Sequence, residues 1–147
     1  MRKTVLTTFI IILFAFTSLP AQNNEANEAY IKAMTTPNVA QRIPALKAWL
    51  TKYAGKGTQY ENYVYAELCR TPYKGKTTKE TTEYGEKALA LGGLDDLFKC
   101  QIYLQVSAVY SQLGQNLEKA KSYASQAIQI AKANKDNNSS SEVTSAT

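Results

Sequence analysis

The chain contains a repeat with a period of 39 residues, and this repeat limits the possible folds more than any other feature of the sequence. The segment EYGEKALAL, residues 83–91, recurs in outline as SYASQAIQI, residues 122–130. The positions shared at this spacing are Gly75 with Gly114, Tyr84 with Tyr123, Ala88 with Ala127, Leu89 with Ile128, and Leu91 with Ile130. A further step back brings Trp49 and Leu50, in RIPALKAWLTKY, weakly into register with Ala88 and Leu89. A unit of this length buries its apolar face only against its neighbours, so the period predicts a stack of about three repeats.

Each repeat is predicted to contain two helices, because its apolar residues recur every three or four positions rather than every two. In the last repeat this spacing is carried by Phe98, Ile102, Val106, Val109 and Leu113. Proline disfavours helix at the residue before it and glycine often follows a helix end, so Pro72 and Gly114 are predicted to stop helices. The predicted helices cover residues 23–35, 38–53, 59–70, 77–91, 95–113 and 117–133. The predicted fold class is therefore all-α, with one repeat domain over residues 22–134.

The last helix carries small residues on the face that is predicted to point inward. Its predicted buried positions are Ala120, Ala124, Ala127, Ile128 and Ala131. Small side chains let two helices approach closely, and alanine has the best intrinsic helix propensity. Large residues on the preceding helix, Tyr103, Leu104 and Tyr110, are expected to fill the remaining space.

The first 21 residues are predicted to be a secretory signal peptide rather than part of the fold. MRK supplies a short positive start, VLTTFIIILFAF an apolar run, and TSLPAQ a small residue, Ala21, at a cleavage position. The run is short for a membrane span, and an uncleaved anchor is the alternative. No cysteine directly follows the run, which excludes lipid attachment at a new N-terminal cysteine. The chain is expected to be exported to the periplasm or the extracellular space, without a stable membrane span once the signal is removed.

The charge of the chain and its polar end bear on the partners to expect. Cleavage after Ala21 lowers the formal net charge from +5 to +3, because Arg2 and Lys3 are lost. So mild a charge does not demand a polyanionic partner, and we expect no nucleic acid to bind. The polar segment 135–147 is predicted to be a disordered tail, since it has too little apolar surface to bury.

The residue types present argue against catalysis. The chain has no histidine, which removes the commonest general base, the commonest metal ligand and every Ser-His or Cys-His pair. Glu80, Glu83 and Glu86 recur every three residues beside lysines, a pattern typical of a solvated helix face. Gly55 and Gly57 lack the strand and the lysine placement of a phosphate-binding loop, and no group of side chains has metal-ligand spacing. We therefore predict a non-enzymatic protein without a cofactor or a metal.

At the repeat positions the chain resembles the tetratricopeptide repeat (TPR) family. The last repeat offers the family's pattern of large, small and aromatic residues in Tyr103, Val106-Ser107, Tyr110, Gly114, Ala120 and Ala127. The first repeat, with Trp49-Leu50 followed by Tyr53, resembles the variant found in exported repeat proteins of the bacterial envelope. Ala124 departs from the family's usual aromatic residue, and the period is 39 rather than about 34 residues. The resemblance covers residues 23–134 and implies a short right-handed solenoid of stacked antiparallel helical hairpins.

The resemblance also bears on the two cysteines, Cys69 and Cys100. In such a solenoid the first helices of successive repeats run parallel, with Cys69 near the end of one and Cys100 near the start of the next. The Cα atoms of paired cysteines lie within about 7 Å of each other. The resemblance therefore implies two buried free thiols, even in an oxidising compartment.

A binding surface is implied by the resemblance, because repeats of this family usually bind through the concave face formed by their first helices. The residues expected on that face are Gln101, Gln105 and Gln112 from the last repeat, with Asn62 and Tyr65 from the repeat before it. Their uncharged polar groups suit hydrogen bonds to a peptide backbone. The expected function is protein–protein or peptide interaction in the cell envelope, with a partner that the sequence does not identify.

A second surface is the alternative. Lysines and tyrosines alternate over residues 52–79, and the candidates within this segment are Tyr73, Lys74 and Lys76. The mixture suits an envelope glycan stacked on tyrosine, or an anionic polymer. It also suits single-stranded nucleic acid, which an exported protein rarely meets. The plainer interpretation is that several tyrosines are core and the lysines solubilise the chain. Homodimerisation stays open as well, because so short an array leaves its terminal faces poorly covered.

Overall fold

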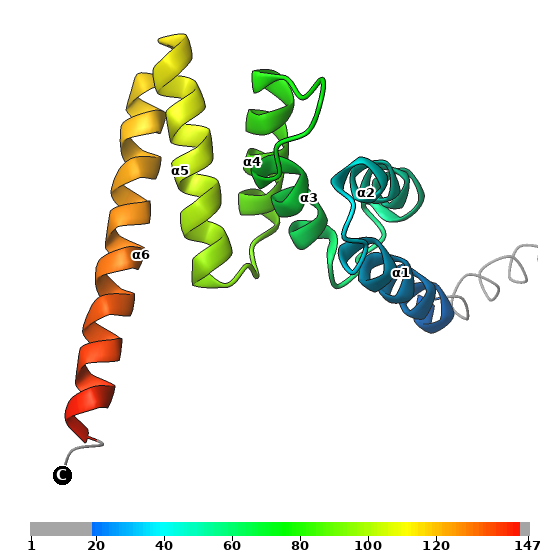
Figure 1. Ribbon diagram of the computed structural model, residues 1–147, viewed down its shortest axis with the longest axis horizontal. Helices are drawn as coiled ribbons and strands as arrows, with labels where there is room; N and C mark the ends of the chain where they lie inside the picture. The colour runs from blue at the N-terminus through cyan, green and yellow to red at the C-terminus, as the bar shows by residue number, and fades with distance from the viewer. Residues whose placement is uncertain (1–18, 145–147) are drawn as a thin grey trace, which may run out of the picture.

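The computed structural model describes residues 19–144, and it describes side chains for residues 23–135. Within this part of the chain there are six α-helices and no strand, so the all-α prediction is confirmed (Figure 1). The helices are α1 (Leu19–Met34), α2 (Val39–Tyr53), α3 (Glu61–Arg70), α4 (Thr78–Leu91), α5 (Asp96–Leu113) and α6 (Leu117–Thr144). The predicted signal peptide, residues 1–21, lies outside the described residues except for its end, which belongs to α1.

Except for the start of α1 and the end of α6, the helices begin and end within two residues of their predicted positions, and local signals explain several of these ends. Asp95 precedes α5, and its carboxylate accepts a hydrogen bond from the Phe98 N–H at 2.9 Å. Thr77 and Glu80 form a capping box at the start of α4, with both backbone-to-side-chain bonds at 3.0 Å. Gly114 ends α5 in the left-handed region at φ +63°, which a residue with a side chain adopts only with strain. The predicted helix stop at Gly114 is confirmed.

Two hydrophobic cores share α3. The first core joins α1, α2 and α3, and its largest ring is Trp49, whose indole N–H donates to the Ala26 carbonyl at 2.7 Å. The second core joins α3, α4 and α5, and its fully buried members include Cys69, Ile102 and Val106. Because α3 contributes to both cores, it connects the N-terminal helices to the C-terminal ones.

Each helix packs against the next along the chain, and α3 also contacts α5. Figure 1 shows α5 and α6 side by side. The α3–α4 pair lies between the α5–α6 pair and the α1–α2 pair. In the same view α2 is seen nearly end-on, whereas α5 and α6 lie close to the plane of the picture. The α1–α2 pair is therefore turned relative to the last two helices.

The small residues of α6 are buried only in part as predicted. Ala120 and Ala127 are almost fully buried, as expected for a close approach to α5. Ile128 and Ala131 were also predicted to be buried, and this is wrong: both are exposed. Leu89, the counterpart of Ile128 one repeat earlier, packs against the second core. The physical reason is that α6 is the last helix described, so no further helix covers the face that carries Ile128.

The C-terminal segment differs from its prediction. Residues 135–147 were expected to be a disordered tail. The structure describes α6 as far as Thr144, and residues 145–147 lie outside the described residues. No glycine or proline occurs between Leu117 and Thr144 to interrupt the helix. Figure 1 shows this end of α6 running past the end of α5.

Both cysteines are free thiols in the structure. Cys69 is fully buried in the second core, and burial raises the pKa of its thiol to about 12. Cys100, in the second turn of α5, is only half-buried, so the predicted burial of this cysteine is wrong. Its thiol faces the Ala127 carbonyl of α6 at 3.7 Å.

Candidate functional site

A groove of about 820 Å³ opens between the start of α2, the end of α3 and the middle of α5. We call it the α2–α3–α5 groove. Its polar lining is Arg42, Glu67, Arg70, Thr71, Gln101 and Gln105. Apolar lining comes from Met34, Val39, Pro72 and Leu104. The groove is therefore lined by residues from each of the three successive helical pairs, α1–α2, α3–α4 and α5–α6.

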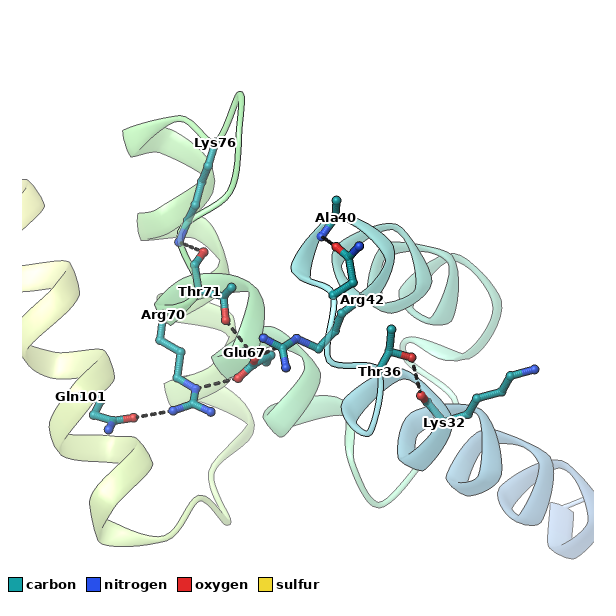
Figure 2. Close-up of polar contacts among 10 residues, drawn as sticks. Lys32, Thr36, Ala40, Arg42, Glu67, Arg70, Thr71, Lys76 and Gln101 are labelled. Atoms are coloured by element: carbon teal, nitrogen blue, oxygen red, sulfur yellow. Dashed lines mark hydrogen bonds and ion pairs between the residues drawn. The ribbon is translucent and has the colours of Figure 1, made fainter.

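Glu67 is the charged centre of the groove. Its side chain is only 2% exposed, and it lies between apolar neighbours on α3. One carboxylate oxygen accepts a hydrogen bond from Arg70 Nε at 2.6 Å, and the other accepts one from the Thr71 hydroxyl at 2.8 Å (Figure 2). A buried carboxylate is costly unless it is paired and hydrogen-bonded. Both partners follow Glu67 within one helical turn, so the end of α3 supplies them locally.

Arg70 connects this centre to α5. Its Nη1 donates to the Gln101 side-chain oxygen at 3.1 Å, and its guanidinium lies 4.6 Å from the centroid of the Phe98 ring. Stacking on an aromatic face suits the planar guanidinium. Figure 2 shows Arg70 between Glu67 and Gln101. The position of Arg70 is therefore held by one carboxylate, one amide and one ring.

Arg42 reaches toward the same carboxylate from α2 (Figure 2). Its Nε lies 3.5 Å from a Glu67 oxygen, an ion pair rather than a hydrogen bond, and this buried nitrogen has no hydrogen-bond partner. The side chain is 20% exposed. Within the described residues, Arg42 is thus a cation in the groove lining whose buried Nε forms an ion pair with Glu67 but no hydrogen bond.

A row of aromatic rings meets Arg70 of the groove through Phe98. Tyr30 and Tyr60 are stacked with centroids 4.3 Å apart, Tyr60 meets Tyr63 at 6.5 Å, and Tyr63 meets Phe98 edge-on at 5.2 Å. Burial, followed by the negative charge of Glu67, raises the pKa of the Tyr30 hydroxyl to about 12. The Tyr30 hydroxyl, at the α1 end of the row, is therefore neutral at neutral pH.

The residues predicted for the concave face divide into two groups. Gln101 and Gln105 line the groove, and Gln112 is exposed on the same helix but lies outside the groove lining. Asn62 is nearly buried: its amide donates to the Gly92 carbonyl at 2.7 Å, and its oxygen accepts from the Tyr63 N–H at 2.8 Å. Tyr65 is 8% exposed and belongs to the second core, next to Tyr84. Asn62 and Tyr65 therefore have structural contacts and do not line the groove.

The alternative surface is also divided by its contacts. Tyr73 and Lys74 line a separate hollow of about 710 Å³ beside α2. Lys47 lies 4.9 Å from the centroid of the Tyr73 ring, and its hydrogen bond to Glu80 at 2.8 Å holds the pKa of that carboxyl at about 2. The Lys76 ammonium donates to the Cys69 and Thr71 carbonyls and so caps the end of α3. Burial lowers the pKa of Lys76, and of the two predicted lysines Lys74 is the exposed one.

Sequence reasoning missed Arg42 and Glu67. The signal for Glu67 was a lone carboxylate in the apolar run VYAELC, residues 64–69, with Arg70 three positions later. That spacing allows a pair within one helix. Arg42 had no such signal, because its partner lies 25 positions away on another helix.

Comparison of the chain with known protein families, with curated proteins and with solved structures finds no match. Among the described residues, no helix combines the length and the apolar character that crossing a membrane requires. Over the same residues, His, Cys, Asp and Glu side chains do not form a group that could hold a metal ion.

Proposed function

We propose that this chain is a non-enzymatic, exported helical-repeat protein that captures a protein or peptide segment in the α2–α3–α5 groove. The observation that carries the proposal is the composition of that groove. Gln101 and Gln105 lie beside apolar surface from Met34, Val39 and Leu104 in one open hollow. Amide side chains pair with the backbone of an extended peptide, and apolar surface receives its side chains.

A TPR-like arrangement of the three helical pairs is part of the proposal. Its support is the 39-residue period, whose repeated positions fall on matching helices. Ala88 of α4 and Ala127 of α6 are equivalent positions of the repeat, and both are almost fully buried. In such a stack the first helices α1, α3 and α5 would form one face. All three contribute to the groove lining, together with Val39 and Arg42 at the start of α2.

Export to the periplasm or the extracellular space is also proposed, and its support comes from the N-terminal sequence. The charged start, the apolar run and the small residue Ala21 have the order of a secretory signal. The partner would then be a protein or peptide of the cell envelope or its surroundings.

Affinity capture with a blocked groove tests the proposal. The full-length chain and its Gln105→Trp variant are used to capture partners from an extract of the source cell's own envelope, with mass spectrometry as the readout. Gln105 is exposed on α5, so a tryptophan there fills the groove without disturbing the core. We expect capture of a protein partner to fall at least about tenfold, since a blocked site loses several contacts at once. Gln129→Trp, the same change on the exposed face of α6, is the matched control and is expected to leave capture unchanged.

A different outcome would indicate that the ligand binds the alternative surface around Tyr73, Lys74 and Lys76. If only cell-wall material is recovered, and Lys74→Glu or moderate salt abolishes its binding while Gln105→Trp does not, the groove is not the binding site. The chain would then be a binder of envelope glycan or anionic polymer.

A further inference from the structure

The groove has an excess of positive charge that its own residues do not neutralise. Three charged side chains line it: Arg42, Arg70 and Glu67. Two cations against one carboxylate leave one positive charge. An otherwise apolar and amide-lined hollow with a single surplus cation is complementary to a ligand that carries a single negative charge on an uncharged chain.

The hydrogen bonds of Glu67 show which cation is in surplus. Its two oxygens already accept bonds from Arg70 at 2.6 Å and from Thr71 at 2.8 Å. The Arg42 Nε lies 3.5 Å from a Glu67 oxygen without forming a hydrogen bond. Arg42 therefore forms an ion pair with Glu67 but no hydrogen bond, and it is the surplus cation. A ligand acceptor in the groove that bonds the Arg42 guanidinium would balance this charge.

We infer that the groove recognises a carboxylate of the captured peptide, bound by Arg42 and by the outer edge of the Arg70 guanidinium. This inference rests on the proposed function, since it names the chemistry that the same groove selects. Arginine presents a planar fork of donors that matches a carboxylate in a bidentate pair. Glu67 does not contact the ligand in this arrangement. It holds Arg70 in place through their hydrogen bond and limits the net charge of the site to +1. The carboxylate comes either from an Asp or Glu side chain or from the C-terminus of the peptide.

Neighbouring residues favour a peptide carboxylate over a phosphate polymer. A polyanion gains affinity from many cations along its length, whereas this groove offers one surplus charge between apolar walls. Gln101 accepts from Arg70 through its oxygen, so its amide nitrogen still has donors for a backbone carbonyl. A carboxylate at Arg42 and a backbone carbonyl at Gln101 together fit a short stretch of acidic peptide.

Peptide selection on wild-type and variant chains tests the inference. Two libraries of random linear peptides, one with a free C-terminus and one with a blocked C-terminus, are selected on the full-length chain, on Arg42→Gln and on Lys121→Gln. Lys121 is exposed on α6 outside the groove lining, so its variant loses the same charge without altering the site. We expect wild type and Lys121→Gln to select the same peptides, with an Asp or Glu at a fixed position or a required free C-terminus. Arg42→Gln is expected to bind those peptides about tenfold or more weakly, as befits a lost charge-assisted bidentate pair.

The peptide itself supplies a second measurement that does not depend on how well a protein variant folds. Replacing the selected Asp or Glu by Asn or Gln, or amidating the C-terminus, is expected to lower affinity for wild type by a similar factor. If the selected peptides are neutral and bind Arg42→Gln as well as wild type, the carboxylate inference is wrong and the proposed function stands. If wild type selects no peptide, or binds polyphosphate instead, both are overturned.

Discussion

Replacing Glu67 by glutamine is expected to lower the free energy of unfolding by about 2 to 3 kcal/mol. Glutamine has nearly the same shape, but it leaves Arg70 and Arg42 without their shared carboxylate in a place where Glu67 is only 2% exposed. Removing one partner of a buried ion pair costs more than the pair contributes, because the remaining charges are left uncompensated. The two arginines are themselves 20% and 35% exposed, which limits the loss. Urea denaturation followed by the helical circular dichroism signal measures it.

The matched control for this variant is Glu83→Gln on α4. Glu83 pairs with Lys79 at 3.7 Å, and both side chains are more than half exposed, so its loss is expected to cost less than about 0.5 kcal/mol. If the Glu67→Gln and Glu83→Gln variants unfolded at the same urea concentration, Glu67 would not be the buried centre of the groove.

Replacing Gly85 by leucine is expected to destabilise the fold by about 3 kcal/mol or more. A Cβ atom at Gly85 would lie 2.3 Å from Val106 Cγ2 and 3.1 Å from Cys69 Sγ, far closer than side-chain atoms approach each other. A leucine therefore forces α4 away from α5 and opens the second core. This loss far exceeds the gain of about 1 kcal/mol in helix propensity that removing a glycine brings. Thermal and urea unfolding of wild type and of Gly85→Leu measure the difference in stability.

Ala90→Leu on the same helix is the control for overpacking, because Ala90 is exposed. It is expected to change the free energy of unfolding by less than about 0.5 kcal/mol. A second test is the double variant with Gly85→Ala and Val106→Ala, in which the shortened valine makes room for the new methyl group. Were Gly85→Leu as stable as wild type, the close approach of α4 to α5 would be refuted.

The helices could be predicted from the sequence because their signals are local. Apolar residues three or four positions apart, together with Pro72 and Gly114, placed the ends of α3 and α5 within a residue or two. The burial of Ala120 and Ala127 followed from the repeat. The exposure of Ile128 did not, because a repeat pattern indicates which face needs a neighbour, whereas only the end of the array decides whether one is present.

Site residues could be predicted from the sequence only where they lie on the same face of one helix. Gln101 and Gln105 were expected on one helix face, and they lie one turn apart on α5 in the lining of the groove. Asn62 and Tyr65 also follow a helical spacing, but the direction in which α3 faces its two cores decides that they are buried. Arg42 and Glu67 meet because α2 packs against α3. Such a contact between distant segments leaves no periodic trace in one sequence.

Hydrogen–deuterium exchange of the full-length chain, alone and with its captured partner or a selected peptide, shows which surface of the protein binds the ligand. If the α2–α3–α5 groove binds the ligand, backbone exchange is expected to slow over residues 34–42, 67–72 and 101–105. Exchange over the exposed face of α6, from Lys121 to Lys132, is expected to stay unchanged. Slowed exchange confined to residues 73–76, or to α6, would contradict the account, because the ligand would then bind the alternative surface or the end of the helical array.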